Sequence, residues 1–483
     1  MLMYESVFRI IKNKIESGLL PEGTSLPSRA DLCREYGVSE KTIRRAVAML
    51  EENGFIETSQ RKRPVVSFRQ EGHKTTILAL EKIDVSVTND VLRTGVLLCY
   101  PVIKNGISLC SPADLEIPRR ILDNMKIDNP SEFWNLSKKF YRFFVARNEN
   151  SLTLQAVDSL GLSELRPLQD NIQLRTRYYG QLRELMSVLE TGGEPESVRF
   201  DDMSGLYGLA AGGTPAFKAA PDSAVLLGTA QLEKLLQISE VRYSAVYMDL
   251  VGLISVGRYR QGDQLPKHKE LQDMYGVSVD TTIKAIQILQ ELGIVKTVRG
   301  NGIFVEMDRD EIQKIHMPPH LTALHVRRYL DTLELLMLTV EGAAACAAAH
   351  ADREDLRASE AEAGRLWNED YLYGRTPAVL LDFITDHIGI EAFGAVYGLL
   401  RRNLRIGRSI PGLLTAEKTP VNCEIHELCM AAFRALMEED RQGFLEKTVK
   451  AFKRIYHLVI EECRRLGYYE AAMEVYDGAT LWK

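Results

Sequence analysis

The sequence predicts a mainly α-helical chain of two similar halves, each with a small module of three helices and a β-hairpin followed by a larger helical bundle. Three observations lead to this prediction. The segment that starts at Tyr4 aligns without a gap on the segment that starts at Tyr243. Apolar residues recur with helical spacing in both segments. The length of 483 residues suggests three or four domains at roughly 100–200 residues each.

The composition is that of an ordinary globular protein, with 45% hydrophobic and 26% charged residues, which excludes collagen and disordered chains. The formal net charge of −6 argues against a nonspecific nucleic-acid coat but leaves a local basic face open. Seven cysteines lie far apart without a CxxC pair, so reduced thiols are expected. The first residues lack the apolar core of a signal peptide, and no apolar stretch approaches the roughly 18 residues of a membrane span. We therefore expect a cytoplasmic protein without a membrane partner.

The repeat is strong over the small module. Leu26-Pro27 aligns with Leu265-Pro266, and the run 36–39 (YGVS) aligns with 275–278, always at a separation of 239 residues. Fainter matches continue further along the chain, since Phe140 falls on Phe383, with the separation drifting as small loop insertions would make it. The predicted parts are module 1 (1–70), bundle 1 (71–209), a linker (210–240), module 2 (241–308) and bundle 2 (309–483).

Each element of module 1 has its own signal. Val7, Ile10, Ile11 and Ile15 predict a first helix that Gly18 ends. Ser28 is a candidate N-cap of a second helix over 30–36, and Gly37 then breaks the chain.

The third helix begins after its predicted cap, Ser39, and carries a buried stripe made of Ile43, Ala46, Val47 and Leu50. Asn53-Gly54 stops it, and FIETS and VVSF then predict two short strands joined by the basic tip RKRP. This order of elements is that of a winged helix-turn-helix.

Such a module suits double-stranded DNA, because its third helix fits the major groove and a hairpin wing can follow the phosphate backbone. Six basic residues converge on the third helix and hairpin tip of module 1, whereas a solvated surface is the usual explanation for a single one. The residues that we expect at DNA are Ser28, Ser39, Lys41, Thr42, Arg44, Arg45, Arg61, Lys62 and Arg63 in module 1, and Lys267, Lys269, Ser278, Thr281, Lys284, Arg299, Gly300, Asn301 and Gly302 in module 2.

Both modules resemble the N-terminal domain of GntR-type bacterial transcription regulators, whose signature runs LPSE-R-x-LA and then GVSR-x-TVR-x-AL. The chain has LPSRADLCREYGVSEKTIRRAV in the first copy and LPKHKELQDMYGVSVDTTIKAI in the second. The resemblance implies three DNA-contacting arginines per module. Their positions are Ala30, Glu40 and Arg44 in module 1, and Lys269, Val279 and Ile283 in module 2.

In the wings it is module 2, and not module 1, that keeps the family pattern. Module 2 keeps the glycine-flanked run 299–302, whereas module 1 has Arg61 and Arg63 where glycines belong. We infer that module 1 is the stronger electrostatic binder. Module 2 is either a weak or altered reader, or a domain that keeps the fold without touching DNA.

The bundles are predicted to be all-helical, because 322–366 and 425–464 lack prolines and have helical apolar spacing. Bundle 2 resembles the ligand-sensing domain of the FadR/FCD branch of GntR regulators, which implies a metal held by one Asp and three His, and a small carboxylate effector. The chain departs from that pattern, with Phe383, Cys429 and Ala451 at ligand positions.

We therefore expect no cofactor and no metal, and Asp382, His387, His426 and His457 are only weak metal candidates. Arg401, Arg402 and His387 are candidates for binding a carboxylate effector. The alternative is a solvated basic face or a surface of intrachain salt bridges.

The expected function is a transcription regulator whose two FCD-like bundles hold two readers in an intrachain pseudo-dimer. One chain would then occupy a pseudo-palindromic operator with two unequal half-sites. Further homodimerisation, the operator, the effector and the sense of regulation stay open.

An enzyme is not expected, since the chain has neither an alternating βα pattern nor a catalytic motif. The remaining alternative is an adaptor that uses its winged helices to bind protein.

Overall fold

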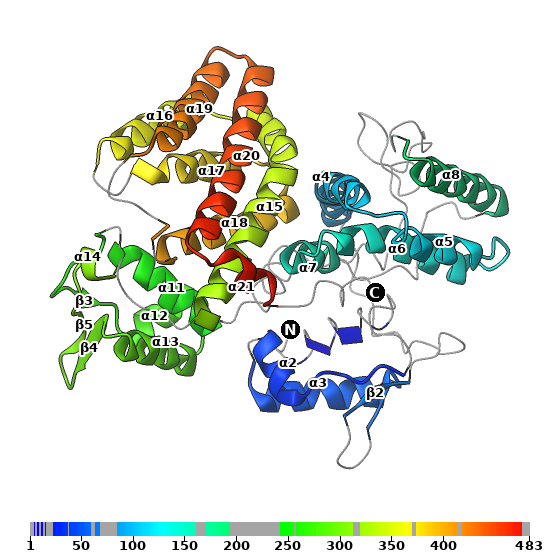
Figure 1. The fold of residues 1–483 in the computed structure, drawn as a ribbon, viewed down its shortest axis with the longest axis horizontal. Helices are drawn as coiled ribbons and strands as arrows, with labels where there is room; N and C mark the ends of the chain where they lie inside the picture. The colour runs from blue at the N-terminus through cyan, green and yellow to red at the C-terminus, as the bar shows by residue number, and fades with distance from the viewer. Residues whose placement is uncertain are drawn as a thin grey trace. The chain divides into compact units, whose positions relative to one another are not determined.

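The computed structural model describes most of the chain (Figure 1), namely parts of 4–15, then 23–67 except 37 and 59–62, 85–160, 171–193, 242–312 except 256 and 276, 319–369, 373–410, 412–413 and 418–475. The described residues are mainly helical. The chain divides into two compact units, one of residues 1–236 with 390–393 and 478–483, and one of residues 237–389 with 394–477. The predicted linker, 210–240, lies outside the described residues.

Module 1 has the predicted winged helix-turn-helix order. Its elements are α2 (Arg29–Tyr36), α3 (Glu40–Glu52), β1 (Ile56–Glu57) and β2 (Val65–Val66), with β1 antiparallel to β2. The predicted stripe of α3 is buried, and it packs in one core with Val7, Ile11 and Ile15 of the preceding helical segment. The strands are shorter than predicted, and Val65 of β2 also forms an isolated antiparallel bridge with Ser25.

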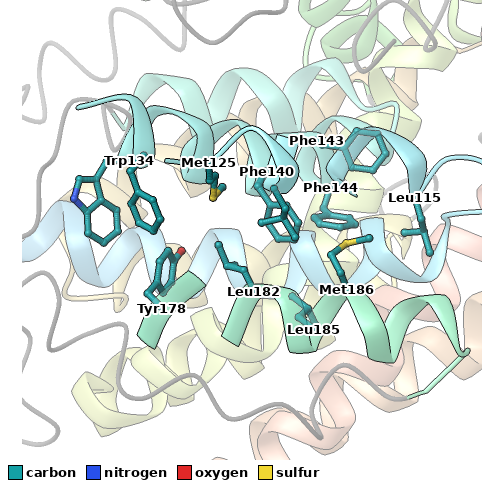
Figure 2. Packing of buried hydrophobic residues seen from close by; sticks show 12 residues of the cluster. Leu115, Met125, Trp134, Phe140, Phe143, Phe144, Tyr178, Leu182, Leu185 and Met186 are labelled. Carbon is teal, nitrogen blue, oxygen red and sulfur yellow. The ribbon is translucent and has the colours of Figure 1, made fainter. Parts of the chain in front are cut away.

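Bundle 1 consists of α4 (Val85–Ser108), α5 (Glu116–Asp123), α6 (Pro130–Arg147), α7 (Ser151–Ser159) and α8 (Ile172–Glu190). Its aromatic core lies between α6 and α8 (Figure 2). The rings of Trp134 and Tyr178 are 5.4 Å apart, and the buried Tyr178 hydroxyl is 2.9 Å from the Ser137 hydroxyl. That hydrogen bond satisfies the one polar group of Tyr178 in an otherwise apolar layer.

Module 2 repeats the same order with a larger sheet. Its elements are α11 (Arg242–Ser255), β3 (Gln264–Leu265), α12 (His268–Tyr275), α13 (Val279–Glu291), β4 (Val295–Val298) and β5 (Gly302–Val305). The strands are antiparallel in the order β3-β5-β4. The sequence predicted only the hairpin β4–β5. The added strand β3 comes from the turn before α12, where Leu265 is buried against the sheet.

Bundle 2 follows, and its main helices are the predicted ones. They are α14 (Arg309–Ile312), α15 (Pro319–His350), α16 (Arg353–Trp367), η3 (Tyr373–Arg375), α17 (Thr376–Asp386), α18 (Glu391–Leu404), η4 (Arg405–Ser409), α19 (Pro420–Met437), α20 (Arg441–Arg465) and α21 (Tyr469–Met473). The FCD-like character of the bundles and the pseudo-dimer stay predictions.

The faint repeat of the bundles agrees with their burial. Phe140 of α6 and its counterpart Phe383 of α17 are both buried. In the same way Leu182 and Met186 of α8 are buried, as are their counterparts Cys429 and Phe433 of α19. Matching positions therefore serve as core positions in both bundles.

Helix α15 contains a stretch, 322–350, that is long and apolar enough to cross a membrane by length and composition. By that criterion the expectation that no stretch approaches a membrane span was wrong. However, 56% of the most apolar window is buried inside the structure, and α15 packs along α20. This burial is that of the core helix of a bundle.

Within the second unit, module 2 is joined to bundle 2 through α11. Tyr247 of α11 and His325 of α15 are both fully buried, and the Tyr247 hydroxyl lies 2.6 Å from His325 Nε2. Asp249 accepts a hydrogen bond from the Tyr275 hydroxyl at 2.8 Å and lies 3.8 Å from the Arg405 guanidinium. Burial, and secondarily the charge of Arg328, lower the pKa of His325 to about 3.

Burial of His325 predicts that the stability of the contact between α11 and α15 depends on pH. An unfolded histidine titrates near pH 6.5, so between about pH 6.5 and 3 the unfolded chain binds a proton that the folded chain does not, and stability falls as the pH falls. His325→Gln removes this titration. We expect the stability gap between wild type and variant to narrow by about 1.4 kcal/mol for each pH unit below 6.5.

The measurement is amide hydrogen exchange of α11 and α15 at several pH values. His457→Gln, at an exposed histidine of α20, is the control and should leave the exchange unchanged. A gap between His325→Gln and wild type that stays constant with pH would contradict a neutral, buried His325.

Candidate nucleic-acid interface

The third helix of each module begins with the same cap. Ser39 Oγ accepts a hydrogen bond from the Thr42 backbone N–H at 3.3 Å, and Ser278 Oγ accepts one from Thr281 N–H at the same distance. The paired hydroxyl groups lie 3.0 and 2.8 Å apart. These four residues, which we expected at DNA, therefore start the helices and fix the direction in which they point.

Ser28 has a similar structural role at the start of α2. Its hydroxyl accepts a hydrogen bond from the Asp31 N–H at 3.2 Å and contacts the Asp31 carboxylate. The side chain is half-buried and already engaged. A contact between Ser28 and DNA stays a prediction.

The basic face of module 1 lies on the side of α3 opposite its buried stripe. Lys41, Arg44 and Arg45 are all exposed there. The Arg44 guanidinium is 3.2 Å from the Glu40 carboxylate, one helical turn away, and Arg45 lies over the Tyr4 ring at 5.5 Å. Because the Arg44–Glu40 pair is exposed to water, it contributes little to stability and leaves Arg44 available for a phosphate or a base.

The wing of module 1 is described only in part. Arg63 is exposed at the start of the second wing strand. Arg61 and Lys62 lie outside the described residues.

Module 2 presents a different face. Lys267, Lys269 and Lys284 are exposed as expected, but the exposed Asp273 and Asp280 lie on the same two helices. Three large apolar side chains are also exposed here: Val279 and Ile283, which lie at positions where the resemblance implies DNA contacts, and Met274, which the sequence did not predict. Val279 and Ile283 lie outside the buried stripe of α13, and that helical spacing could have indicated their exposure.

The wing of module 2 has the geometry that its glycines permit. Asn301 N–H donates to the Val298 carbonyl at 2.9 Å, which closes the tip, and the Gln264 amide of β3 donates to the Asn301 carbonyl at 2.7 Å. Gly300 and Gly302 have φ of 82° and 124°, backbone regions that favour glycine. Arg299 is exposed at this tip.

The effector candidates in bundle 2 already have protein partners. Arg401 donates to the Asp386 carboxylate at 2.8 Å and lies 3.8 Å from that of Asp382. His387 donates from Nδ1 to the Phe383 carbonyl at 2.8 Å, and its Nε2 is 3.3 Å from the Asp355 carboxylate. Arg402 is exposed. An anion would therefore have to compete with Asp382 and Asp386 for Arg401.

The described residues do not fit the metal site that the family resemblance implies. They contain no group of three or more His, Cys, Asp or Glu side chains placed to hold a metal ion. His426 stacks on Trp367 with ring centroids 4.0 Å apart, and His457 is exposed on α20. Burial raises the pKa of Asp382, and the nearby Arg401 opposes that shift.

Both modules match one protein family. Residues 3–66 and 242–305 each match the model of the bacterial regulatory proteins of the gntR family. These two segments are the two winged helix-turn-helix modules of the structure. The chain therefore carries the GntR-type DNA-binding domain of transcription regulators twice.

Curated relatives match this chain over short segments. The HTH-type transcriptional regulator TreR of Bacillus subtilis (strain 168) is 32% identical over 72 residues, 15% of this chain and 30% of that protein. The HTH-type transcriptional regulator GgaR of Escherichia coli (strain K12) is 38% identical over 58 residues, 12% of this chain and 23% of that protein. The match thus spans less than a third of either relative.

Solved structures that match include a Streptococcus agalactiae GntR protein, at 17% identity over 44% of this chain and 99% of that chain. Another is E. coli McbR/YncC, at 18% identity over 46% of this chain and 99% of that chain. The TM-scores, 0.22 and 0.19, are too low for a comparison of whole folds.

The wing geometry predicts unequal effects of two alanine substitutions. A Cβ at Gly300 would meet no atom, so Gly300→Ala should cost about 1 kcal/mol of module 2 stability through its backbone alone. A Cβ at Gly302 would clash with the Gln264 side chain that ties the tip to β3, so Gly302→Ala should cost about 2 kcal/mol or more.

Hydrogen exchange of the β4 and β5 amides measures both costs. Adding Gln264→Ala removes the clash, so Gly302→Ala should cost less in that background than in wild type. If Gly300→Ala and Gly302→Ala lower the stability of module 2 by the same free energy in an otherwise wild-type chain, the described contact of Gly302 with Gln264 is contradicted.

Proposed function

We propose that the protein is a sequence-specific DNA-binding transcription regulator that acts in the cytoplasm and catalyses no reaction. The observation that carries the proposal is the GntR-type module, matched twice, with an exposed basic face on α3 opposite its buried stripe. An α-helix with such a face fits the major groove, and its Lys and Arg side chains neutralise phosphates.

The two modules are proposed to read two unequal half-sites of one pseudo-palindromic operator. Support comes from their third helices, where Lys41 and Arg44 of α3 correspond to Asp280 and Ile283 of α13. A pair of identical subunits could not differ in this way. Fusion in one chain also gives the second reader a high effective concentration once the first is bound, without dimerisation. Further pairing of two chains is compatible with this proposal as long as each chain occupies its own minimal site.

Regulation is proposed to come from a small carboxylate effector at Arg401, Arg402 and His387 of bundle 2. Support comes from the chain path, since Arg401 of α18 precedes η4 by one turn, and Arg405 of η4 pairs with Asp249 of module 2. An anion that drew Arg401 away from Asp386 would disturb this turn. Such a link would couple two distinct sites.

The basic face of α3 predicts a loss of salt-dependent binding. Changing Lys41, Arg44 and Arg45 together to alanine should lower the slope of log affinity against log salt by up to about three, because each phosphate contact contributes about 0.9. The measurement is a salt titration of full-length protein on duplexes selected from random DNA. Arg120→Ala with Arg183→Ala, at exposed arginines of bundle 1, is the control and should leave the slope unchanged.

Two outcomes would contradict the proposal. No retained DNA at low salt would favour the adaptor alternative, in which the winged helices bind protein. A stoichiometry of two chains on the minimal selected site would contradict the pseudo-dimer while leaving DNA binding intact.

A further inference from the structure

Module 2 has an exposed apolar surface at the end of α12 and the start of α13, the part of a helix-turn-helix that faces DNA. Met274, at the end of α12, is 55% exposed, and Val279 and Ile283, in the first turns of α13, are 42% and 38% exposed. The described part of the second unit exposes three large hydrophobic side chains, and they are these three. They gather where a helix-turn-helix meets its target, so their exposure is unlike that of scattered surface residues.

The matching positions of module 1 are charged. Met274, Val279 and Ile283 align with Glu35, Glu40 and Arg44 at the constant separation of 239 residues. Glu40 and Arg44 form an ion pair one helical turn apart, 3.2 Å between their charged atoms. In module 2 both partners are replaced by branched aliphatic residues.

Charged groups of both signs are exposed on the module that carries the apolar surface. Lys269, Lys284 and the wing residue Arg299 are exposed on the same module and suit the phosphate backbone. Asp273 and Asp280 are exposed as well, and a carboxylate at the start of a reading helix accepts hydrogen bonds from base amino groups but not from guanine O6 or N7. The exposed basic residues of this GntR-type DNA-binding module suit a nucleic-acid partner, and its exposed carboxylates restrict which base edges the module can meet.

The chemistry of the groove then selects the base. The 5-methyl group of thymine is the apolar group that a base pair presents in the major groove. Side chains at positions i and i+4 of a helix have Cβ atoms about 5–6 Å apart, and successive base pairs are separated by about 3.4 Å. Val279 and Ile283 can therefore contact thymine methyl groups one or two base pairs apart.

We propose that module 2 reads an A·T-rich half-site through contacts of Val279 and Ile283 with thymine methyl groups, while module 1 reads its half-site through the guanidinium of Arg44. This proposal rests on the proposed function and adds which base each module recognises. It makes the two operator arms different in composition, one with guanine opposite Arg44 and one with closely spaced thymines.

The test removes methyl groups without changing hydrogen bonds. Full-length protein is titrated against its selected duplex and against duplexes in which every thymine of one arm is replaced by deoxyuridine. The arm of module 1 is the one whose protection from cleavage is lost in the Lys41, Arg44 and Arg45 alanine variant. Deoxyuridine in the other arm should weaken binding about fourfold for each contacted methyl, and deoxyuridine in the module 1 arm should have no such effect.

Two variants assign the effect to the side chains. The double variant Val279→Ala, Ile283→Ala should bind the duplex equally well whether the module 2 arm contains thymine or deoxyuridine. Val279→Glu with Ile283→Arg reinstates the pair of module 1 and should shift the selected second arm toward guanine. Val96→Ala, at an exposed apolar residue of α4, is the matched control and should keep the wild-type discrimination.

Three results would overturn the proposal. One is a two-armed site that binds equally well with deoxyuridine in either arm. Another is unchanged DNA affinity in the Val279→Ala, Ile283→Ala variant, which would assign the surface to a protein partner. The third is protection of a single arm, which would mean that module 2 does not read DNA. In all three cases binding by module 1 persists, whereas failure of the proposed function is the loss of all salt-sensitive DNA binding.

Discussion

The second unit depends on one helix that packs on both sides. Helix α11 packs against α13 within module 2 and against η4 of bundle 2. Tyr247 and His325 close this joint with a hydrogen bond in a fully buried position, where a charged imidazole would be costly. The third helix of module 2 and η4 of the bundle thus pack on the same helix.

The sequence predicted what local chemistry decides. The stripe on α3 could be identified because Ile43, Val47 and Leu50 recur with the period of a helix whose other side is polar. Ser39 could be identified as a cap because a serine before such a stripe satisfies an N–H group that would otherwise lack a partner. Ser278 aligns with Ser39 in the repeat and caps α13 in the same way.

Contacts between residues distant in sequence could not be predicted in the same way. Tyr247 and His325 are separated by 78 positions, and nothing near either residue marks them as partners. An intrachain salt bridge was one expectation for Arg401, but nothing in the sequence named its partner, Asp386, fifteen residues before it. The resemblance placed Val279 and Ile283 at DNA-contacting positions, and their spacing puts them off the buried stripe of α13, but the exposure of Met274 beside them had no signal because apolar residues in helices are usually core residues.

The duplication within one chain changes how such a protein can diverge. In a symmetric homodimer every substitution appears in both subunits, so both arms of the bound site must change together. Here the Glu40–Arg44 ion pair of one module corresponds to the Val279–Ile283 pair of the other, and each can change independently. A single mutation thus changes one module and leaves the other as it was. The surfaces of the two modules can therefore diverge one step at a time, a gradual route that a symmetric dimer does not have.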